Sequence, residues 1–418
     1  MKRKALWISI IGILLIGFVC LFCYRHYIRQ KQIEQKKHTG LVSEDFPVQD
    51  IKHQSKNIYE DAYQAETDTQ LQIMKDNHSY TIEDPLLVWN PYGTNTGSFY
   101  YYGISEQDSY VVCEVTCNNG SVIKHRLKND SDSGVTKTHE YLITGLAPGL
   151  KNHFSLAFYD AGNNLIHTYQ YTVTLKKDKQ IPAITKVEKG NSKSSLTDGL
   201  FAVLGHDKSK AKNIYYYDNN GICRGKTPLD DYRTDRILTI DGKIVYSYSL
   251  TDIAFVNRLG KVEKTLSLGK YELHHDFMYD EKRNELLCLV NDTDKDTIED
   301  VLISVNIETG KVKKLVDFEK MMKSMRKRSV QRKGGKNTYG GTELDWLHLN
   351  SLDMINDKDA VFSSREESVI IKINNIYENP SIDYLIHSGS LYKGTKYEKL
   401  LLRQKGNFVG HAGQHTIT

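Results

Sequence analysis

Apolar and polar residues alternate in short runs over much of the chain, and turn-forming sequences separate the runs. Between residues 85 and 178 six such runs are divided by NNG, DSDSG, APG and DAGNN turns. Alternation with a period of two is typical of strands with one buried face, and regular short strands favour a small antiparallel β-sandwich. The predicted strands are residues 98–104, 109–117, 122–127, 139–146, 152–160 and 167–175.

From residue 185 onward the strand pattern repeats. Each unit contains an apolar strand, a second strand, a polar turn and a third strand. Repeats of roughly 40–50 residues with three or four strands are typical of β-propeller blades. A fifth unit only begins before the sequence ends. The four units that can be traced include residues 200–224, 236–266, 284–316 and 359–386.

The N-terminal region has a different pattern. Residues from Ala5 to Cys23 are uncharged, and as a helix they would extend roughly 28 Å, close to the hydrocarbon core of a bilayer. Bulky residues occupy the end of this segment, at 17–25, where a cleaved signal peptide would have small ones. We therefore expect an uncleaved signal anchor over residues 1–27, a polar stalk over 28–84, and the rest of the chain outside the cytoplasm at the cell membrane.

Composition narrows the function classes. The 418 residues suit two or three domains, and 27 Tyr with only seven Pro fit a strand-rich protein. The formal charge of +4 is too small to indicate a nucleic-acid partner, and no stripe of basic and aromatic residues is present.

Cys113 and Cys117 lie four positions apart in one predicted strand, roughly 13 Å, whereas disulfide Cα atoms lie about 5.5 Å apart. We expect two small buried side chains rather than a disulfide.

Three histidines recur at similar positions in successive repeat units. Asn291 lies 17 residues after His274, and Arg365 lies 17 residues after His348. His415 follows His348 at a comparable distance. If each histidine begins an inner strand, the three side chains converge at one mouth of the propeller channel, with Arg365 on a neighbouring strand.

Such a cluster has three interpretations. The histidines could be structural residues inherited with the repeat. They could bind a metal, although the sequence places no obvious carboxylate to offset the charge of Arg365. They could also bind a tetrahedral oxyanion, because a guanidinium pairs with two oxygens at once.

Several motifs resemble those of bacterial arylsulfate sulfotransferases, which move sulfuryl groups between phenols without a nucleotide donor. DWLHLNS at 345–351, SSR at 363–365 and GQH at 413–415 follow in order, with HHD at 274–276 upstream. The resemblance covers roughly residues 85 to 418. It implies an all-β fold in which a small N-terminal β-sandwich, at 85–178, precedes an incomplete six-bladed β-propeller, at 185–418, behind one transmembrane helix.

The resemblance also implies a mechanism. His415 would be the nucleophile and would carry a transient sulfohistidine, which predicts ping-pong kinetics. His348 and Arg365 would hold the sulfuryl oxygens. An aryl sulfate donor and a phenol acceptor would be the substrates, with no cofactor, no metal and no nucleic acid, and a homodimer is possible.

Two further residues receive roles in this way. His274 would assist the phenolic oxygen or bind the sulfuryl group, and it is preferred to His275 because it keeps the 17-residue offset. Asn350 would orient one of the reacting groups as a substrate-binding residue.

The chain departs from the family in two ways. No Cys pair matches a disulfide often found near the site, and the family continues beyond GQH through the rest of a fifth blade and a sixth. We therefore expect a C-terminally truncated chain with little activity. The rival functions are a non-catalytic propeller that binds sulfated or phenolic ligands, and hydrolysis with water as the acceptor.

A basic segment at residues 320–336 has two interpretations. It could be a solvated helical insertion. It could also be a flap over the channel mouth that attracts anionic aryl sulfates or touches anionic lipid.

The anchor leads to a direct prediction. Protease added to intact cells should remove the part of the chain after the anchor, because that part is expected outside the cytoplasm, and the membrane-bound N-terminus should remain. Mass analysis should find no new N-terminus between Val19 and Lys31. A new terminus there would show that the segment is a cleaved signal peptide.

Overall fold

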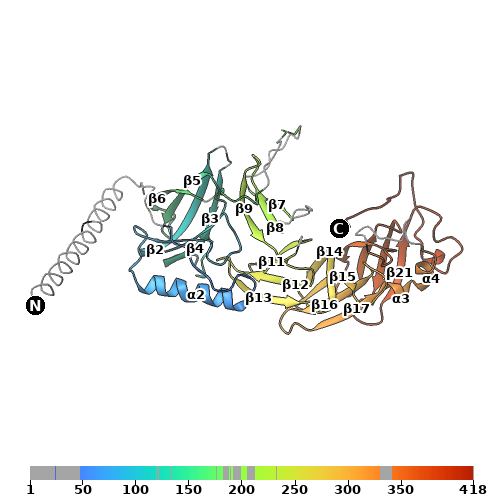
Figure 1. The fold of residues 1–418 in the computed structure, drawn as a ribbon. Helices are drawn as coiled ribbons and strands as arrows, with labels where there is room; N and C mark the ends of the chain where they lie inside the picture. The colour runs from blue at the N-terminus through green and yellow to red at the C-terminus, as the bar shows by residue number, and fades with distance from the viewer. Residues whose placement is uncertain are drawn as a thin grey trace, which may run out of the picture. The chain divides into compact units, whose positions relative to one another are not determined.

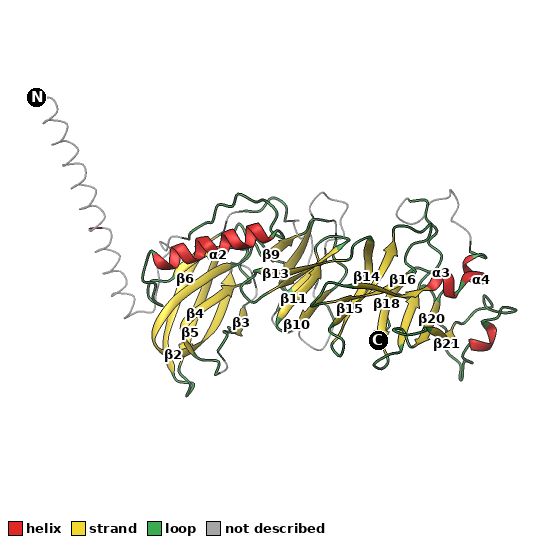
Figure 2. Cartoon of the chain, turned by 90° about the horizontal axis from the view of Figure 1, so that it is seen from below, coloured by secondary structure: helices red, strands yellow, loops and turns green. Residues whose placement is uncertain are grey.

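The computed structural model describes residue 24, residues 48–329 with short gaps, and residues 341–417; the gaps are 119, 121, 132, 176, 182–187, 189, 192–198, 205–211 and 232. The predicted anchor from Ala5 to Cys23 lies outside these residues. Within the described part, no helix is long and apolar enough to cross a membrane. As predicted, this part is mostly β, with antiparallel sheets (Figure 2).

The chain forms two compact units. Unit 1 comprises Met1–Val203, Tyr215–Thr227 and Arg258–Gly260. Unit 2 comprises Leu204–Ile214, Pro228–Asn257 and Lys261–Thr418.

Unit 1 contains two sheets that share one long strand. The first half of β2 pairs with β1 and β4, and its second half pairs with β3 and β5, with β6 beyond β5. Inward residues from both halves of β2 enter one hydrophobic core. The strands are β1 (Leu86–Trp89), β2 (Phe99–Cys117), β3 (Ile123–Arg126), β4 (Thr136–Ile143), β5 (Lys151–Tyr159) and β6 (Leu165–Thr174).

The separate strands predicted at 98–104 and 109–117 are continuous in the structure. The polar SEQD sequence between them indicated a break, but β2 passes through it with a register shift against β4 between Ile104 and Ser109. The Ser105 hydroxyl donates to the carbonyl oxygen of Gln107 at 2.6 Å, which helps this polar stretch remain extended. Cys113 and Cys117 both lie in β2 as buried free cysteines, as predicted.

Helix α2 (Asp61–Asp76) contributes to the core of unit 1, alongside the sheets (Figure 1). Leu71 on its buried face packs with Leu86 and Tyr100. Lys75 in the last turn donates to Glu140 on β4 at 2.6 Å. Residues 51–80, which were expected to form part of a stalk, therefore supply core contacts for the strand-rich unit.

Four sheets follow the four predicted repeat units. The first has three strands, and each of the others is an antiparallel meander in which every strand pairs with the next in sequence (Figure 1). Meanders of this kind are expected of propeller blades. The described strands do not establish a closed ring, so the propeller stays a prediction. The sheets are β7 (Phe201–Val203), β8 (Asn213–Tyr217) and β9 (Cys223–Pro228); β10 (Ile237–Ile240), β11 (Lys243–Ser247), β12 (Asp252–Val256) and β13 (Val262–Ser267); β14 (Tyr271–Asp280), β15 (Glu285–Asp292), β16 (Val301–Asn306) and β17 (Val312–Asp317); β18 (Leu349–Met354), β19 (Ala360–Ser364), β20 (Val369–Asn374) and β21 (Ser381–Ile386).

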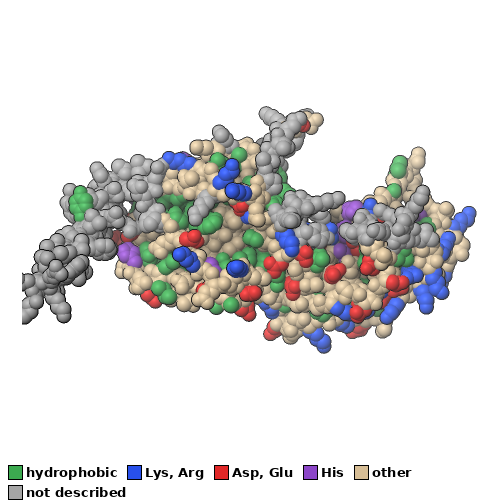
Figure 3. All heavy atoms as spheres, in the orientation of Figure 1, with side chains coloured by type: hydrophobic (Ala, Val, Ile, Leu, Met, Phe, Trp, Pro, Cys, Tyr) green, Lys and Arg blue, Asp and Glu red, His purple; other side chains and the backbone are tan. Residues whose placement is uncertain are grey.

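The basic segment begins in two short helices, α3 (Phe318–Met321) and α4 (Lys323–Arg326), and a 3-10 turn, η1 (Glu398–Leu400), occurs later in the chain. Lys and Arg side chains gather near α3 and α4 (Figure 3). Arg326 pairs with Asp296 at 2.7 Å and with Glu319 at 3.4 Å. These helices thus present a solvated basic surface, and residues 330–340 lie outside the described part.

A buried ion pair in unit 1 allows a stability prediction. Arg224 and Asp218 are fully buried, and the Arg224 guanidinium also donates to the Gly145 carbonyl at 2.8 Å. Arg224→Met should lower the free energy of unfolding by about 3–5 kcal/mol, because it leaves the Asp218 carboxylate buried without its cation. Urea denaturation of the purified chain measures the loss.

The double variant Arg224→Met/Asp218→Asn is the control. Asn keeps an acceptor for the backbone N–H groups of Asn220 and Ile222 but removes the charge. The double variant should be more stable than the single one. A loss below about 1 kcal/mol in the single variant would contradict this account.

Candidate functional site

Three histidine rings of unit 2 converge. The ring centroids of His275 and His348 are 4.9 Å apart, and those of His275 and His415 are 5.8 Å apart. The third side of the triangle, from His348 to His415, measures 6.2 Å. We call His275, His348 and His415 the histidine triangle. Because the three residues come from different parts of the sequence, unit 2 must fold before the triangle exists.

Backbone irregularities aim two of these side chains. His275 has a φ of 55° and His348 a φ of 50°, in the left-handed region that residues other than glycine seldom adopt. Each lies beside a register shift, His275 between β14 and β15 and His348 just before the shift between β18 and β19. Bulges re-aim side chains and are common near active sites. The shared backbone geometry makes His275 the counterpart of His348.

The structure therefore differs from the preference for His274 over His275. Between the pairs Leu273–Val290 and Phe277–Cys288, β14 advances four residues while β15 advances two. At the shift in the later sheet, β18 advances two residues while β19 advances one. Strand β14 thus contains one more extra residue than β18, and counting along the sequence cannot detect it. The equal 17-residue offset does not mark equivalent positions.

Two carboxylates hold His348. Its Nδ1 lies 2.7 Å from Glu299 Oε2 and 2.8 Å from Asp345 Oδ2. Burial disfavours charge on this ring, but the bonds with Asp345 and Glu299 outweigh it and raise the pKa of His348 to about 9. Burial likewise disfavours charge on Glu299, yet His275 and His348 hold the pKa of its carboxyl well below its usual range. His348 and Glu299 therefore form a buried ion pair.

His275 contacts both members of this ion pair. Its Nε2 is 3.2 Å from His348 Nε2 and 3.5 Å from Glu299 Oε2. These two contacts, with His348 and with Glu299, orient the His275 ring.

His274 points elsewhere. The residue is 2% exposed, and neither ring nitrogen has a hydrogen-bond partner among the described residues. Burial is the largest cause that lowers its pKa, to about 3. The residue contacts the ring of His275, with centroids 5.6 Å apart, but does not line the neighbouring cavity.

The segment that contains His415 is held by β18 and by the turn between β19 and β20. The Asn350 side chain donates to the Gln414 carbonyl at 2.7 Å. The backbone N–H of Gly413 donates to Ser368 Oγ, and that of Ile417 donates to Ser351 Oγ, both at 3.0 Å. Asn350 therefore orients the residue next to His415.

A cavity of about 540 Å³ opens on this cluster. His275, Asn350 and His415 line it, together with Asp276 and Arg236. A volume of this size suits a small aromatic ligand. Partial burial, followed by the neighbouring histidines and the guanidinium of Arg365, lowers the pKa of His415 below 6.5. His415 is exposed, and its lowered pKa favours the neutral ring, whose nitrogen can act as a nucleophile.

Arg365 lies next to the triangle. Its backbone N–H donates to the His348 carbonyl at 3.0 Å. Its side chain is 31% exposed and its guanidinium lies 3.3 Å from Glu366 Oε1. The structure thus places all five sequence-predicted site residues in unit 2 and brings His348, Arg365, Asn350 and His415 to one cluster, with His274 buried beside it.

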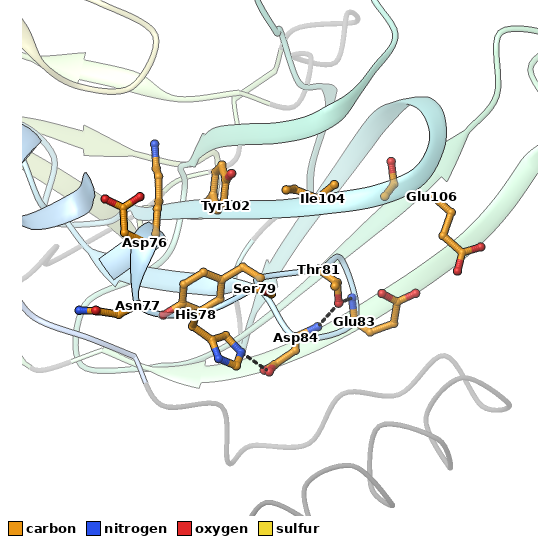
Figure 4. Close-up of a pocket in the computed structure, with 13 residues that line it drawn as sticks. Asp76, Asn77, His78, Ser79, Thr81, Glu83, Asp84, Tyr102, Ile104 and Glu106 are labelled. Carbon is orange, nitrogen blue, oxygen red and sulfur yellow. Dashed lines mark hydrogen bonds and ion pairs between the residues drawn. The ribbon is translucent and has the colours of Figure 1, made fainter. Parts of the chain in front are cut away.

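Another cavity lies in unit 1, and none of these side chains line it. It measures about 1030 Å³. Acidic residues such as Asp76, Glu83 and Asp84 line it, and His78 bonds to Asp84 at 3.0 Å (Figure 4). Its size alone does not make it a site, and the basic residues that line it are one lysine, Lys75, and one histidine, His78.

Among the described residues of unit 2, two sets of ligand atoms lie close enough to hold a metal ion. They are His274, His275 and Glu299, and Glu299, Asp345 and His348; within each set the atoms lie within 4.8 Å of one another.

Sequence analysis missed both carboxylates. Asp345 stands in the DWLHLNS motif, three residues before His348, and that spacing could have suggested contact. Glu299 precedes β16 in an ordinary polar loop, and nothing in the sequence marks it. Only the packing of that loop against β14 and β18 reveals its position.

Comparison with known proteins identifies one family. The family model described as arylsulfotransferase (ASST) matches residues 185–418, more than half of the chain. No curated protein matches the chain.

The contact of Asn350 with Gln414 gives a prediction. Asn350→Asp removes the N–H donor and turns a carboxylate toward the Gln414 carbonyl, so the His415 segment should detach more often. Hydrogen exchange at the Gly413 and Ile417 amides should quicken roughly tenfold, equivalent to about 1.4 kcal/mol.

The control is Asn374→Asp on β20 of the same sheet, which adds the same charge away from this segment. Its exchange at Gly413 and Ile417 should match the parent chain. Equal exchange in both variants would show that Asn350 does not hold the segment.

Proposed function

The chain belongs to the arylsulfotransferase family, and we propose that it transfers a sulfuryl group from an aryl sulfate to a phenol through a sulfohistidine on His415. The observation that carries the proposal is the histidine triangle beside the 540 Å³ cavity, with Arg365 next to it. Nucleophile, proton-handling groups and cationic groups thus meet where an aryl sulfate can enter.

In the first step the free ring nitrogen of His415 attacks sulfur. The nitrogen–sulfur bond forms as the bond from sulfur to the aryl oxygen breaks, and the phenolate leaves. In the second step an acceptor phenol attacks the same sulfur and frees the ring. Two displacements replace one difficult transfer, which is the general advantage of covalent catalysis.

Charge builds on the oxygens during each displacement. Arg365 can pair with two sulfuryl oxygens through its guanidinium, and the ion-paired His348 adds positive charge nearby. His275 takes the role that the resemblance gave to His274, because it faces the cavity. Its imidazole can pass a proton to the leaving phenolate and remove one from the acceptor.

The sulfohistidine leads to a prediction. Incubation of the purified chain with ³⁵S-labelled 4-nitrophenyl sulfate, without acceptor, should label the protein. The label should be labile to acid and should leave when a phenol is added. His415→Asn should take up no label, because its amide cannot form the bond to sulfur.

The matched control is His411→Asn, four residues earlier in the same segment, which should label like the parent chain. Labelling that persists in His415→Asn would rule out this nucleophile. Saturable binding of the aryl sulfate with no label in the parent chain would instead indicate a non-catalytic binding protein. Release of sulfate to water without acceptor would indicate a hydrolase.

A further inference from the structure

The His274 ring is buried among the described residues without the hydrogen bonds that buried polar groups normally make to their neighbours. The residue is 2% exposed, and within the described part of the chain both ring nitrogens lack a hydrogen-bond partner. Buried polar atoms are nearly always paired, and leaving one unpaired costs about 1–3 kcal/mol. The proposed transfer reaction gives this residue no role that would offset the cost.

The neighbours of His274 form a ligand set. One ring nitrogen of His274, one of His275 and a carboxylate oxygen of Glu299 lie within 4.8 Å of one another, and His275 Nε2 lies 3.5 Å from Glu299 Oε2. Ligand bonds of about 2.0–2.1 Å in a tetrahedral zinc site put the ligand atoms roughly 3.3 Å apart. The observed separation therefore fits without large rearrangement. Two imidazoles with one carboxylate also form a known zinc donor set that leaves a fourth position open.

The second possible set is less suitable. His348 Nδ1 already lies 2.7 Å from Glu299 and 2.8 Å from Asp345, which are direct hydrogen-bond distances. Atoms this close share a proton and leave no room for an ion between them. The first set shares Glu299 with the second, but both ring nitrogens of His274 are without a hydrogen bond to any described residue.

The charges around the site also favour a cation. The sequence-based objection to a metal was the charge of Arg365 with no carboxylate to offset it, and the structure supplies Glu299 and Asp345. A second cavity, of about 410 Å³, borders Glu299 and is lined by three further carboxylates and one lysine. These are Glu272, Asp292, Glu343 and Lys295. A metal site needs such an entry path.

We propose that His274, His275 and Glu299 bind a divalent transition-metal ion of the zinc class. Imidazole nitrogen suits zinc and its neighbours better than calcium or magnesium, which prefer oxygen ligands. A bound ion occupies the nitrogen of His275 that faces His348, so metal binding opposes the use of His275 in sulfuryl transfer. The competition for His275 rests on the proposed function, whereas the metal site itself does not.

The test uses the full chain, freed of metal with a chelator and then dialysed. Isothermal titration with Zn²⁺ should show one saturable site per chain, and Co²⁺ should give the visible absorption of a four-coordinate complex. His274→Ala should weaken Zn²⁺ binding about 100-fold or more, since even residues behind the ligands change metal affinity 10- to 100-fold. Glu299→Gln, which keeps the side-chain shape, should weaken it similarly.

His153→Ala is the control, because it removes an exposed histidine of unit 1 and should leave binding unchanged. Zn²⁺ should also raise the melting temperature of the parent chain, a readout that requires no variant to fold. Absence of saturable binding to the parent chain, or undiminished binding in folded His274→Ala, would overturn the proposal. No aryl sulfate is present in these measurements, so their failure leaves the transferase proposal intact.

Discussion

The carboxylate of Glu299 is buried between two imidazoles, and the arrangement of the site depends on it. A buried carboxylate is costly unless opposite charge and hydrogen bonds compensate it. His348 supplies both at 2.7 Å, and His275 adds a contact at 3.5 Å. The same oxygen thus orients two members of the histidine triangle. Without Glu299, His348 would lose one of its two anionic partners, and His275 would lose a contact that fixes its ring.

Backbone strain is the second element of this arrangement. Left-handed φ values at His275, Glu299 and His348 each cost free energy that the surrounding sheets must offset. Hydrogen bonds to the backbone of these residues offset part of this cost. The Glu299 N–H donates to Asn291 Oδ1 at 2.8 Å, and the Glu299 carbonyl accepts from Leu349 N at 3.0 Å. Three strained residues that face one another are more easily explained by a functional site than by packing alone.

The same cluster offers two chemistries that compete for His275. In the proposed transfer reaction, the His275 ring, which lines the 540 Å³ cavity, would handle protons. In the proposed metal complex, the His275 nitrogen that faces His348 and Glu299 binds the ion instead. A histidine cluster that carries carboxylates serves either use, and the ligand present decides between them. Sequence spacing alone does not reveal this competition. It depends on the proximity of His274 and Glu299 to His275, which only the folded structure shows.

The sequence by itself determined the strand-rich character, the four repeat units and the family motifs, because alternation, turn residues and short motifs are local properties. It also placed His348, Arg365, Asn350 and His415 together, since these lie within motifs of fixed order. Tertiary structure decided the rest. The choice between His274 and His275 depends on one extra residue in the bulge of β14, and spacing cannot show on which strand a bulge occurs. Glu299 reaches the site only because its loop packs between two sheets, a long-range contact that leaves no local signal.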